Sequence, residues 1–195
     1  MHIEGEKICL RAVEPQDVEL MYRWENDASV WAVSGTIAPF SRYQLERFVE
    51  EQQFDLQQTR QQRLMIQTKA DGRAVGALDL FELDLLHRRA GIGILIAEPE
   101  DRGRGYATDA VLAVARYARE VLGLHQLWCN VGAENVASRA LFAACGFEEC
   151  GVKRDWVRTP AGWQDEVMLQ KMLYLKAIKN GVAETTPFFL LRCFS

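Results

Sequence analysis

A short run of glycines and arginines has the residue types and spacing of an anion-binding loop. It reads Arg102-Gly103-Arg104-Gly105-Tyr106-Ala107 and is followed by Thr108. Two glycines permit a tight backbone path, so that successive N–H groups point inward before a helix begins at about Thr108. These free amides and the positive end of the helix dipole favour phosphate, and the two arginines could add charge-assisted contacts. We therefore expect residues 102–108 to hold a pyrophosphate.

Two familiar nucleotide-binding loops do not fit this run. A Walker loop needs Gly-Lys-Ser/Thr, and no such triplet follows here. A Rossmann fingerprint needs a third glycine and an acidic residue after a second strand, and both are missing. An ordinary turn between a strand and a helix is the remaining alternative. The elements around residues 102–108 are therefore needed to distinguish a phosphate-binding loop from such a turn.

The elements before the loop follow from the hydrophobic pattern. Residues 7–13 alternate like a strand, and a helix follows Pro15. The stretch from Asn26 to Phe40 is rich in turn residues, and Ser41 is a good N-cap for a second helix. The connection between these two helices could edge a cleft.

The elements around and after the loop follow the order of β-hairpins around two strand–helix units. Three strands fit the stretch 63–97 as a meander, and the last of them is apolar on both faces, as in a central strand. Apolar residues at helical spacing over 107–121 make the clearest helix of the chain. The remaining expected elements are a strand at 125–131, a helix at 135–145 and a hairpin of 147–159 with 163–173.

The run from Arg102 to Ala107 has the pattern Arg-x-x-Gly-x-Ala, which resembles the acetyl-CoA loop of the GNAT N-acetyltransferase family. Residues 135–147 resemble the helix that follows in that family, and residues 8–17 resemble its first strand and turn. The resemblance covers residues 7–173 in order and spacing.

The resemblance implies an α/β (α+β) domain with the acyl-CoA N-acyltransferase fold. Its sheet would be mixed and mostly antiparallel, with about seven strands splayed in the middle, and about four helices would cover it. The domain would occupy residues 1–173, which leaves residues 174–195 as a C-terminal tail of unknown role.

The resemblance also implies where acetyl-CoA binds. The pantetheine arm would enter the split in the sheet and pair with backbone groups of Ile94, Leu95 and Ile96 like an added strand. The side chain of Asn135 would contact the arm across the gap. Asn135 could instead serve only as a helix cap.

Attack of an amine on a thioester requires a proton for the departing thiolate. Many family members supply it from a tyrosine seven residues after the helix asparagine, where this chain has Phe142. Ser138 follows Asn135 by three residues and shares its helix face. It matches a serine that is thought to assist the thiolate in ribosomal-protein N-terminal acetyltransferases, which this helix also resembles. Our hypothesis is that Ser138 assists the thiolate here, against the alternative of a plain surface serine.

Three carboxylates could accept the amine proton, because Asp79, Glu82 and Asp84 interrupt an otherwise apolar strand. Regular alternation puts Glu82 and Asp84 on one face and Asp79 on the other, and only a bulge could bring all three together. We rank Glu82 first and Asp79 second as the general base. A solvated strand end is the alternative.

The acceptor is less well specified. Residues 82–90 resemble the corresponding turn of polyamine acetyltransferases, yet residues 34–39 lack the adjacent glutamates that this branch carries before a proline. The sequence therefore favours acetyl transfer from acetyl-CoA to a primary amine of a small molecule or a protein N-terminus. A spermidine-type polyamine acceptor, a catalytically weak acetyl-CoA-binding module and an interaction protein that merely shares the fold are the alternatives.

Composition narrows the class of protein. Of the 195 residues, 49% are hydrophobic and 26% are charged, as in ordinary globular domains, and a formal net charge of −4 argues against nucleic acid as a partner. The N-terminus lacks a secretory signal and no stretch reaches the roughly 18 apolar residues of a membrane span, so we expect a cytoplasmic protein. The apolar run at 187–191 could cover a second copy of the chain, which leaves a homodimer open.

The cysteines give no sign of a metal site or a disulfide framework. There are five, with no Cys-x-x-Cys pair and no nearby histidine. We expect buried thiols at Cys9, Cys129, Cys145, Cys150 and Cys193.

Overall fold

The computed structural model describes residues 2–174 apart from 35, 53, 55 and 160, so the apolar run at 187–191 and Cys193 lie outside the described residues. Its strands are β1 (Ile3–Glu4), β2 (Ile8–Ala12), β3 (Gln62–Thr68), β4 (Ala74–Asp84), β5 (Arg89–Ile96), β6 (Gln126–Gly132), β7 (Glu148–Thr159) and β8 (Gly162–Met172). Its helices are α1 (Val18–Glu25), α2 (Ala28–Ser34), α3 (Arg42–Glu51), α4 (Leu56–Thr59), α5 (Tyr106–Glu120) and α6 (Val136–Ala144), with 3-10 turns η1 (Pro15–Asp17) and η2 (Pro99–Asp101).

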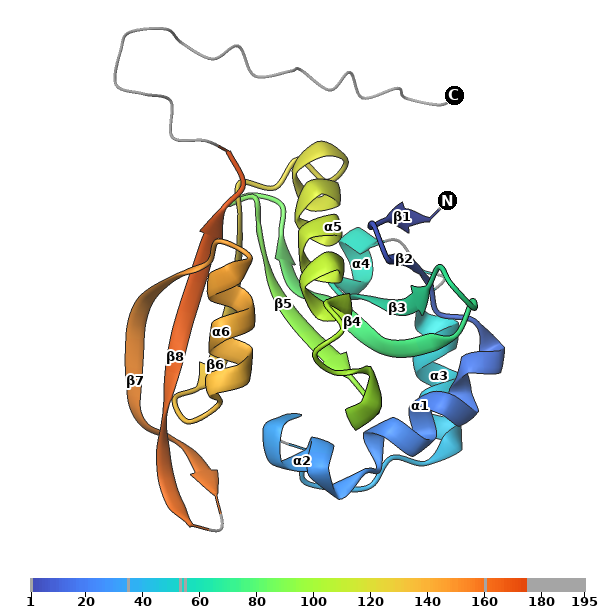
Figure 1. Ribbon diagram of the computed structural model, residues 1–195, viewed down its shortest axis with the longest axis horizontal. Coiled ribbons are helices and arrows are strands. Elements are labelled where there is room, and N and C mark those ends of the chain that lie inside the picture. The colour runs from blue at the N-terminus through green and yellow to red at the C-terminus, as the bar shows by residue number, and fades with distance from the viewer. Residues whose placement is uncertain (1, 35, 53, 55, 160, 175–195) are drawn as a thin grey trace, which may run out of the picture.

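The strands form one sheet in the order β1-β2-β3-β4-β5-β6-β8-β7, and every neighbouring pair is antiparallel except β5 with β6 (Figure 1). The predicted mixed, mostly antiparallel sheet is therefore confirmed. No helix among the described residues has the length and apolar character needed to cross a membrane.

The described residues hold eight strands and six α-helices, against expected numbers of about seven and about four. The additional elements are short: β1 has 2 residues and α4 has 4. Helix α2 falls in the stretch that we expected to be a loop. The carboxylate of Asp27 accepts the N–H and hydroxyl of Ser29 at 2.7 and 2.6 Å, so a polar cap starts this helix without a strong hydrophobic period.

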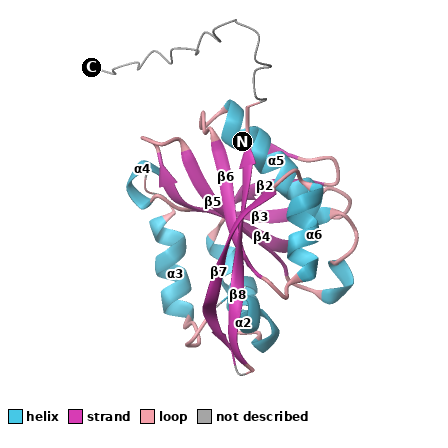
Figure 2. Ribbon diagram, turned by 90° about the vertical axis from the view of Figure 1, so that its left-hand side faces the viewer, coloured by secondary structure: helices cyan, strands magenta, loops and turns pink. Residues whose placement is uncertain are grey.

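Helices cover both faces of the sheet. On one face α5 and α6 pack against buried residues of β2 to β6 and β8, and on the other face α1 and α3 pack against Met65 and Ala77. Figure 2 shows α3 on one side of the strands with α5 and α6 on the other. Helix α5 buries a stripe of small apolar residues that includes Ala110, Val114 and Ala118, which lets it lie close to the central strands.

The sheet splits in the middle. Strands β4 and β5 pair along most of their length, from Gly76 with Ile96 to Asp84 with Arg89. The ladder between β5 and β6 has pairs only at their first residues and ends at Gly91 with Trp128. Beyond this point the two strands diverge (Figure 1). The predicted splay between the strands at 91–97 and 125–131 is therefore present.

Candidate active site

The predicted anion-binding loop joins η2 to the N-terminus of α5. Gly103 and Gly105 adopt φ values of +73° and +85°, in the left-handed region where a side chain is strained. Gly105 is the N-cap of α5, so the helix starts at Tyr106, and the first-turn N–H groups have no earlier helical carbonyl to bond. The tight path predicted for the two glycines is confirmed. We expected the helix to start at about Thr108, and it starts two residues earlier, at Tyr106.

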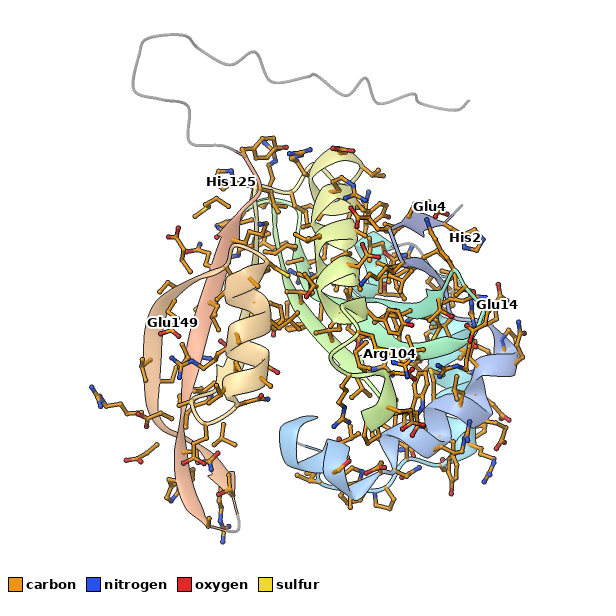
Figure 3. All side chains as sticks on the ribbon, in the orientation of Figure 1. His2, Glu4, Glu14, Arg104, His125 and Glu149 are labelled. Atoms are coloured by element: carbon orange, nitrogen blue, oxygen red, sulfur yellow. The ribbon has the colours of Figure 1, made fainter. Side chains whose placement is uncertain are left out.

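The two loop arginines bind backbone carbonyls. The guanidinium of Arg102 donates to the carbonyl oxygens of Ile96 and Ala97 at 3.2 and 2.9 Å, and Arg104 donates to Glu100 at 2.7 Å. Arg104 lies at the N-terminal end of α5 (Figure 3). These contacts brace the loop. That these arginines also bind phosphate stays a prediction. Each guanidinium has further N–H groups that could make such contacts.

A lysine from the first hairpin adds a further cation at the loop. The Nζ atom of Lys7 donates to the carbonyl of Arg104 at 3.0 Å and lies 3.1 Å from the position that a Cβ on Gly105 would take. The sequence analysis missed Lys7, because a residue almost 100 positions away carries no local signal for the loop.

A buried ion pair fixes the chain just before the loop. The carboxylate of Asp101 is fully buried and accepts hydrogen bonds from both Nη atoms of Arg73 at 2.7 Å each. The Arg73 guanidinium lowers the pKa of Asp101, so this carboxyl group stays charged. Arg73 comes from the turn between β3 and β4 and thereby ties that turn to η2.

The residues expected along the pantetheine arm border the split. Ile94, Leu95 and Ile96 are half-buried and lie beyond the last residue pair between β5 and β6. Asn135 is the N-cap of α6, where its Oδ1 atom accepts the N–H of Ser138 at 3.1 Å. The helix-cap role of Asn135 is therefore present. Its contact with the pantetheine arm stays a prediction. The side-chain NH₂ group of Asn135 donates to none of the described residues, so it is available for that contact.

The two α6 residues considered for the proton of the thiolate differ in environment. Phe142 is 4% exposed and packs edge-on against Phe147, with ring centroids 5.0 Å apart, so it belongs to the core. Ser138 is half-buried, and its hydroxyl bonds none of the described residues. Only Ser138 offers an unoccupied proton donor.

A bulge in β4 changes which way the three carboxylates face. Phe81 pairs with Gly91 and Asp84 with Arg89, which leaves one extra residue on β4, and Glu82 adopts φ +49°. Leu83 then points into the core of the α5 face. The bulge that we named as the exception to regular alternation is therefore present, and it resets the alternation, so that Glu82 and Asp84 do not lie on the face opposite Asp79.

The three carboxylates have different partners. Asp79 binds the guanidinium of Arg63 through both oxygens, and Asp84 pairs with Arg89 at 3.2 Å. Glu82 is exposed and forms no ion pair with the described residues. Glu82 is thus the carboxylate of this strand that remains available to a ligand.

A cavity of about 1000 Å³ lies beside Glu82, next to the residues at which β5 and β6 still pair. The rings of Phe81 and Trp128 meet edge-on in its wall, with centroids 5.3 Å apart. Gly91 permits this, because a Cβ there would lie 2.3 Å from the Phe81 ring. The cavity is lined by Thr59, Arg60, Gln61, Phe81, Glu82, Asp84, Arg89, Gln126, Trp128, Asn130, Lys153, Met168 and Gln170.

Most lining residues were missed by the sequence analysis, which concentrated on β4 and α6. They come from α4 and its connection to β3, from β5 and β6, and from the final hairpin, and only the sheet order brings these segments together. Two of the lining cations are already paired: Arg89 with Asp84, and Lys153 with Glu166 at 2.8 Å.

The cysteines play no part in this cavity. Cys129 and Cys145 are buried as expected, and Cys9 is half-buried. Cys150 is exposed on the edge strand β7, so the expectation of a buried thiol there was wrong. The described residues contain no group of three or more His, Cys, Asp or Glu side chains that could hold a metal ion.

Comparison with known proteins identifies the family. A sequence model described as "Acetyltransferase (GNAT) domain" matches residues 7–148. The spermidine N(1)-acetyltransferase of Vibrio cholerae is 27% identical over 145 residues, which cover 74% of this chain and 81% of that protein. The corresponding protein of Escherichia coli K12 is 30% identical over 141 residues, or 72% of each chain.

Solved structures give the same fold. The crystal structure of spermidine N-acetyltransferase from Vibrio cholerae in complex with CoA and spermine has a TM-score of 0.78 at 22% identity, covering 87% of this chain and 97% of that one. The split sheet, the glycine loop at the start of α5 and the family match agree with one another. The chain belongs to the GNAT acetyltransferase family and is an acetyl-CoA-dependent N-acetyltransferase.

Proposed function

We propose that the acceptor is a primary amine that binds in the cavity beside Glu82, with the Glu82 carboxylate as the general base. The observation that carries this proposal is the bulge in β4, which presents Glu82 at the cavity wall without an ion-pair partner among the described residues. A carboxylate in this position can take the proton of an ammonium group, directly or through water.

Donor binding follows from the loop and the split. The first-turn N–H groups of α5, with Arg102, Gly103, Arg104, Gly105, Tyr106, Ala107 and Thr108, would hold the pyrophosphate. Backbone groups of Ile94, Leu95 and Ile96 and the side chain of Asn135 would hold the pantetheine arm. Acetyl-CoA supplies the acetyl group as a thioester.

The proton balance then involves two side chains. Glu82 removes a proton from the acceptor ammonium, so that the neutral nitrogen can form the new C–N bond to the acetyl carbon as the C–S bond breaks. The departing thiolate needs a proton, and Ser138 would supply it directly or through water. The nitrogen is cationic after the C–N bond forms, so it loses its second proton as the C–S bond breaks, and this proton replaces the one lost by Ser138, directly or through water. Glu82 releases its proton to solvent before the next turnover.

The charges of the cavity favour an acceptor with a single reacting ammonium. Of the two lining carboxylates, Glu82 forms no ion pair within the part of the chain that the structure describes, and Asp84 is bound by Arg89. Lys153 and Arg60 add positive charge to the same wall. A second ammonium of the acceptor would have to displace Arg89 from Asp84. An amine of a small molecule or a protein N-terminus meets the fewest like charges here.

A polyamine such as spermidine is the second candidate. Two curated relatives at 27% and 30% identity are spermidine N(1)-acetyltransferases. The Asp84–Arg89 contact is long at 3.2 Å, and the Arg89 side chain is 46% exposed, so a ligand could compete for Asp84.

A screen of acceptors tests the proposal. The release of CoA is measured with monoamines, spermidine, aminoglycosides and peptides that carry a free N-terminus, and kcat/KM is compared among them. We expect Glu82→Gln to lower kcat by about 100-fold or more for the best acceptor. Glu46→Gln is the matched control, because Glu46 is an exposed carboxylate of α3 away from the cavity. Tight binding of acetyl-CoA without transfer to any amine would instead support a catalytically weak binding module.

A homodimer is a further part of the proposal, motivated by the apolar run at 187–191 in the sequence. The mass in solution of the full chain, compared with that of a chain ended after Tyr174, tests it. A monomer in both cases would contradict the dimer.

A further inference from the structure

The bulge that presents Glu82 also leaves the next residue without its regular strand partner. The ladder of β4 with β5 passes from Phe81–Gly91 directly to Asp84–Arg89, and the ladder with β3 ends at Leu80. The backbone N–H and C=O of Leu83 must therefore bond elsewhere, because buried backbone groups are rarely left unpaired.

Arg60 supplies both missing partners. Its main-chain carbonyl accepts the N–H of Leu83 at 3.0 Å, and its side-chain Nε donates to the carbonyl of Leu83 at 2.9 Å. Its own N–H bonds the carbonyl of Leu56 at 2.9 Å and thereby closes α4. The connection from α4 to β3 is thus joined to the bulge by a reciprocal pair of hydrogen bonds.

Arg60 and Glu82 share an unusual backbone conformation. Their φ values are +54° and +49°, and a left-handed conformation costs free energy for any residue with a side chain. Such conformations persist only where the surroundings impose them. Both residues also line the same cavity. The two hydrogen bonds between Arg60 and Leu83 can impose the left-handed conformations of Arg60 and Glu82.

We infer that Arg60 is a positioning residue for Glu82: it holds the β4 bulge in the conformation that aims the Glu82 carboxylate into the cavity. This inference rests on the proposed role of Glu82 as the base. The effect runs through the backbone, because no ion pair joins Arg60 to Glu82 among the described residues.

Two substitutions of Arg60 distinguish a role of its hydrogen bond to Leu83 from a role of its positive charge. In Arg60→Gln the side-chain nitrogen is the same number of bonds from Cα as Nε of arginine, so the donor to Leu83 is kept while the charge is lost. In Arg60→Met both the donor and the charge are lost. We expect Arg60→Met to lower kcat by about tenfold or more with the KM for acetyl-CoA unchanged, and Arg60→Gln to stay within about threefold of the wild-type kcat.

A cycle with Glu82→Gln tests the coupling. If Arg60 acts through Glu82, Arg60→Met costs almost nothing more in the Glu82→Gln background, whereas independent effects would multiply. Arg116→Met is the matched control, since Nη2 of Arg116 also donates to a distant backbone carbonyl, that of Glu4 at 2.6 Å. Thermal unfolding of each variant separates a loss of kcat from a loss of folded protein.

Hydrogen exchange of the Leu83 amide tests whether the Arg60 side chain holds the bulge, without relying on catalysis. This N–H donates to the main-chain carbonyl of residue 60, which both variants keep, so faster exchange reports a loosened bulge. We expect faster exchange in Arg60→Met and wild-type protection in Arg60→Gln. Equal losses of kcat in the two Arg60 variants, multiplicative effects in the cycle, or unchanged Leu83 exchange in Arg60→Met would each overturn the inference. Full activity of Glu82→Gln would instead reject the base proposed above, and the exchange data would still show whether Arg60 holds the bulge.

Discussion

The guanidinium of Arg63 binds the carboxylate of Asp79 through two parallel hydrogen bonds, from Nε to Oδ1 at 2.8 Å and from Nη2 to Oδ2 at 2.9 Å. The same guanidinium pairs with Glu25 at the end of α1 and lies over the ring of Phe48 in α3. Burial lowers the pKa of Arg63, but the two carboxylates outweigh this effect and hold the pKa above its ordinary value. Arg63 therefore joins the sheet to α1 and α3, and Asp79 holds its guanidinium in place.

This arrangement predicts different outcomes for the two candidate bases. Asp79→Asn should lower the free energy of unfolding by about 2 kcal/mol, because it leaves the largely buried Arg63 with one carboxylate in place of two. It should leave kcat of the folded enzyme within a few fold of wild type. Urea unfolding and initial rates measure the two effects. A loss of turnover at unchanged stability would assign the base to Asp79.

Local signals explain the elements that the sequence predicted. Ser41 was expected to cap a helix, and its hydroxyl accepts the N–H of Gln44 at 3.1 Å while the Gln44 side chain accepts the N–H of Ser41 at 2.8 Å. Both partners lie within four residues, so the sequence alone contains the motif. The tight turn at Gly103 and Gly105 was predictable for the same reason, because a turn before a helix depends only on neighbouring residues.

The parts of the site that escaped prediction depend on strand register. Arg63 meets Asp79 only because β3 and β4 pair at these residues, and Arg60 reaches Leu83 only because of the bulge. A one-residue shift in a strand exchanges its two faces, so side-chain periodicity could not reveal which carboxylate stays free. The cavity was not predictable for the same reason, because its lining residues come from segments that only the tertiary structure brings together.

The glycine at the N-cap of α5 should be essential for donor binding. A side chain at Gly105 would meet Lys7 Nζ at 3.1 Å and would strain the backbone at φ +85°. Strain of about 1–2 kcal/mol in the donor-bound loop corresponds to a rise of about tenfold in the KM for acetyl-CoA in Gly105→Ala. Gly151→Ala is the control, because a Cβ at Gly151 meets nothing within 4 Å. Equal KM values in the two variants would argue against this loop as the donor site.

The ion pair of Asp101 with Arg73 predicts a dependence of stability on pH. Arg73 lowers the pKa of Asp101 in the folded protein. The stability from this pair is therefore fully present above the unfolded pKa of about 3.9 and is lost as the pH falls through the folded pKa. We expect Asp101→Asn to be less stable than wild type at neutral pH, and the two to converge below about pH 4. Thermal unfolding between pH 2 and 7 measures this, and parallel curves would contradict it.

The cysteines should differ in reactivity. Burial raises the pKa of the Cys129 thiol to about 12, whereas Cys150 is exposed on β7. Alkylation requires the thiolate, so iodoacetamide at pH 8 should modify Cys150 in the native protein and Cys129 only after unfolding. Peptide mass spectrometry assigns the sites. Rapid native labelling of Cys129 would mean that the core around β6 opens readily.

The proposed role of Ser138 predicts a specific loss of turnover. Ser138→Ala should lower kcat by about tenfold or more without changing the KM for acetyl-CoA, and Ser138→Thr should keep most of the activity because it retains a hydroxyl. An unchanged kcat in Ser138→Ala would exclude Ser138 from the reaction.

Phe142→Tyr provides the complementary test, because it introduces the tyrosine that the family resemblance led us to expect as the general acid at this position. Phe142 is 4% exposed and its ring packs against Phe147, so a hydroxyl added there enters an apolar core. We expect a loss of about 1–3 kcal/mol in the free energy of unfolding. We expect no gain in kcat, even in the Ser138→Ala background. If the tyrosine rescued Ser138→Ala, position 142 would have to reach the sulfur when the donor is bound, and the serine would be a substitute for the usual acid.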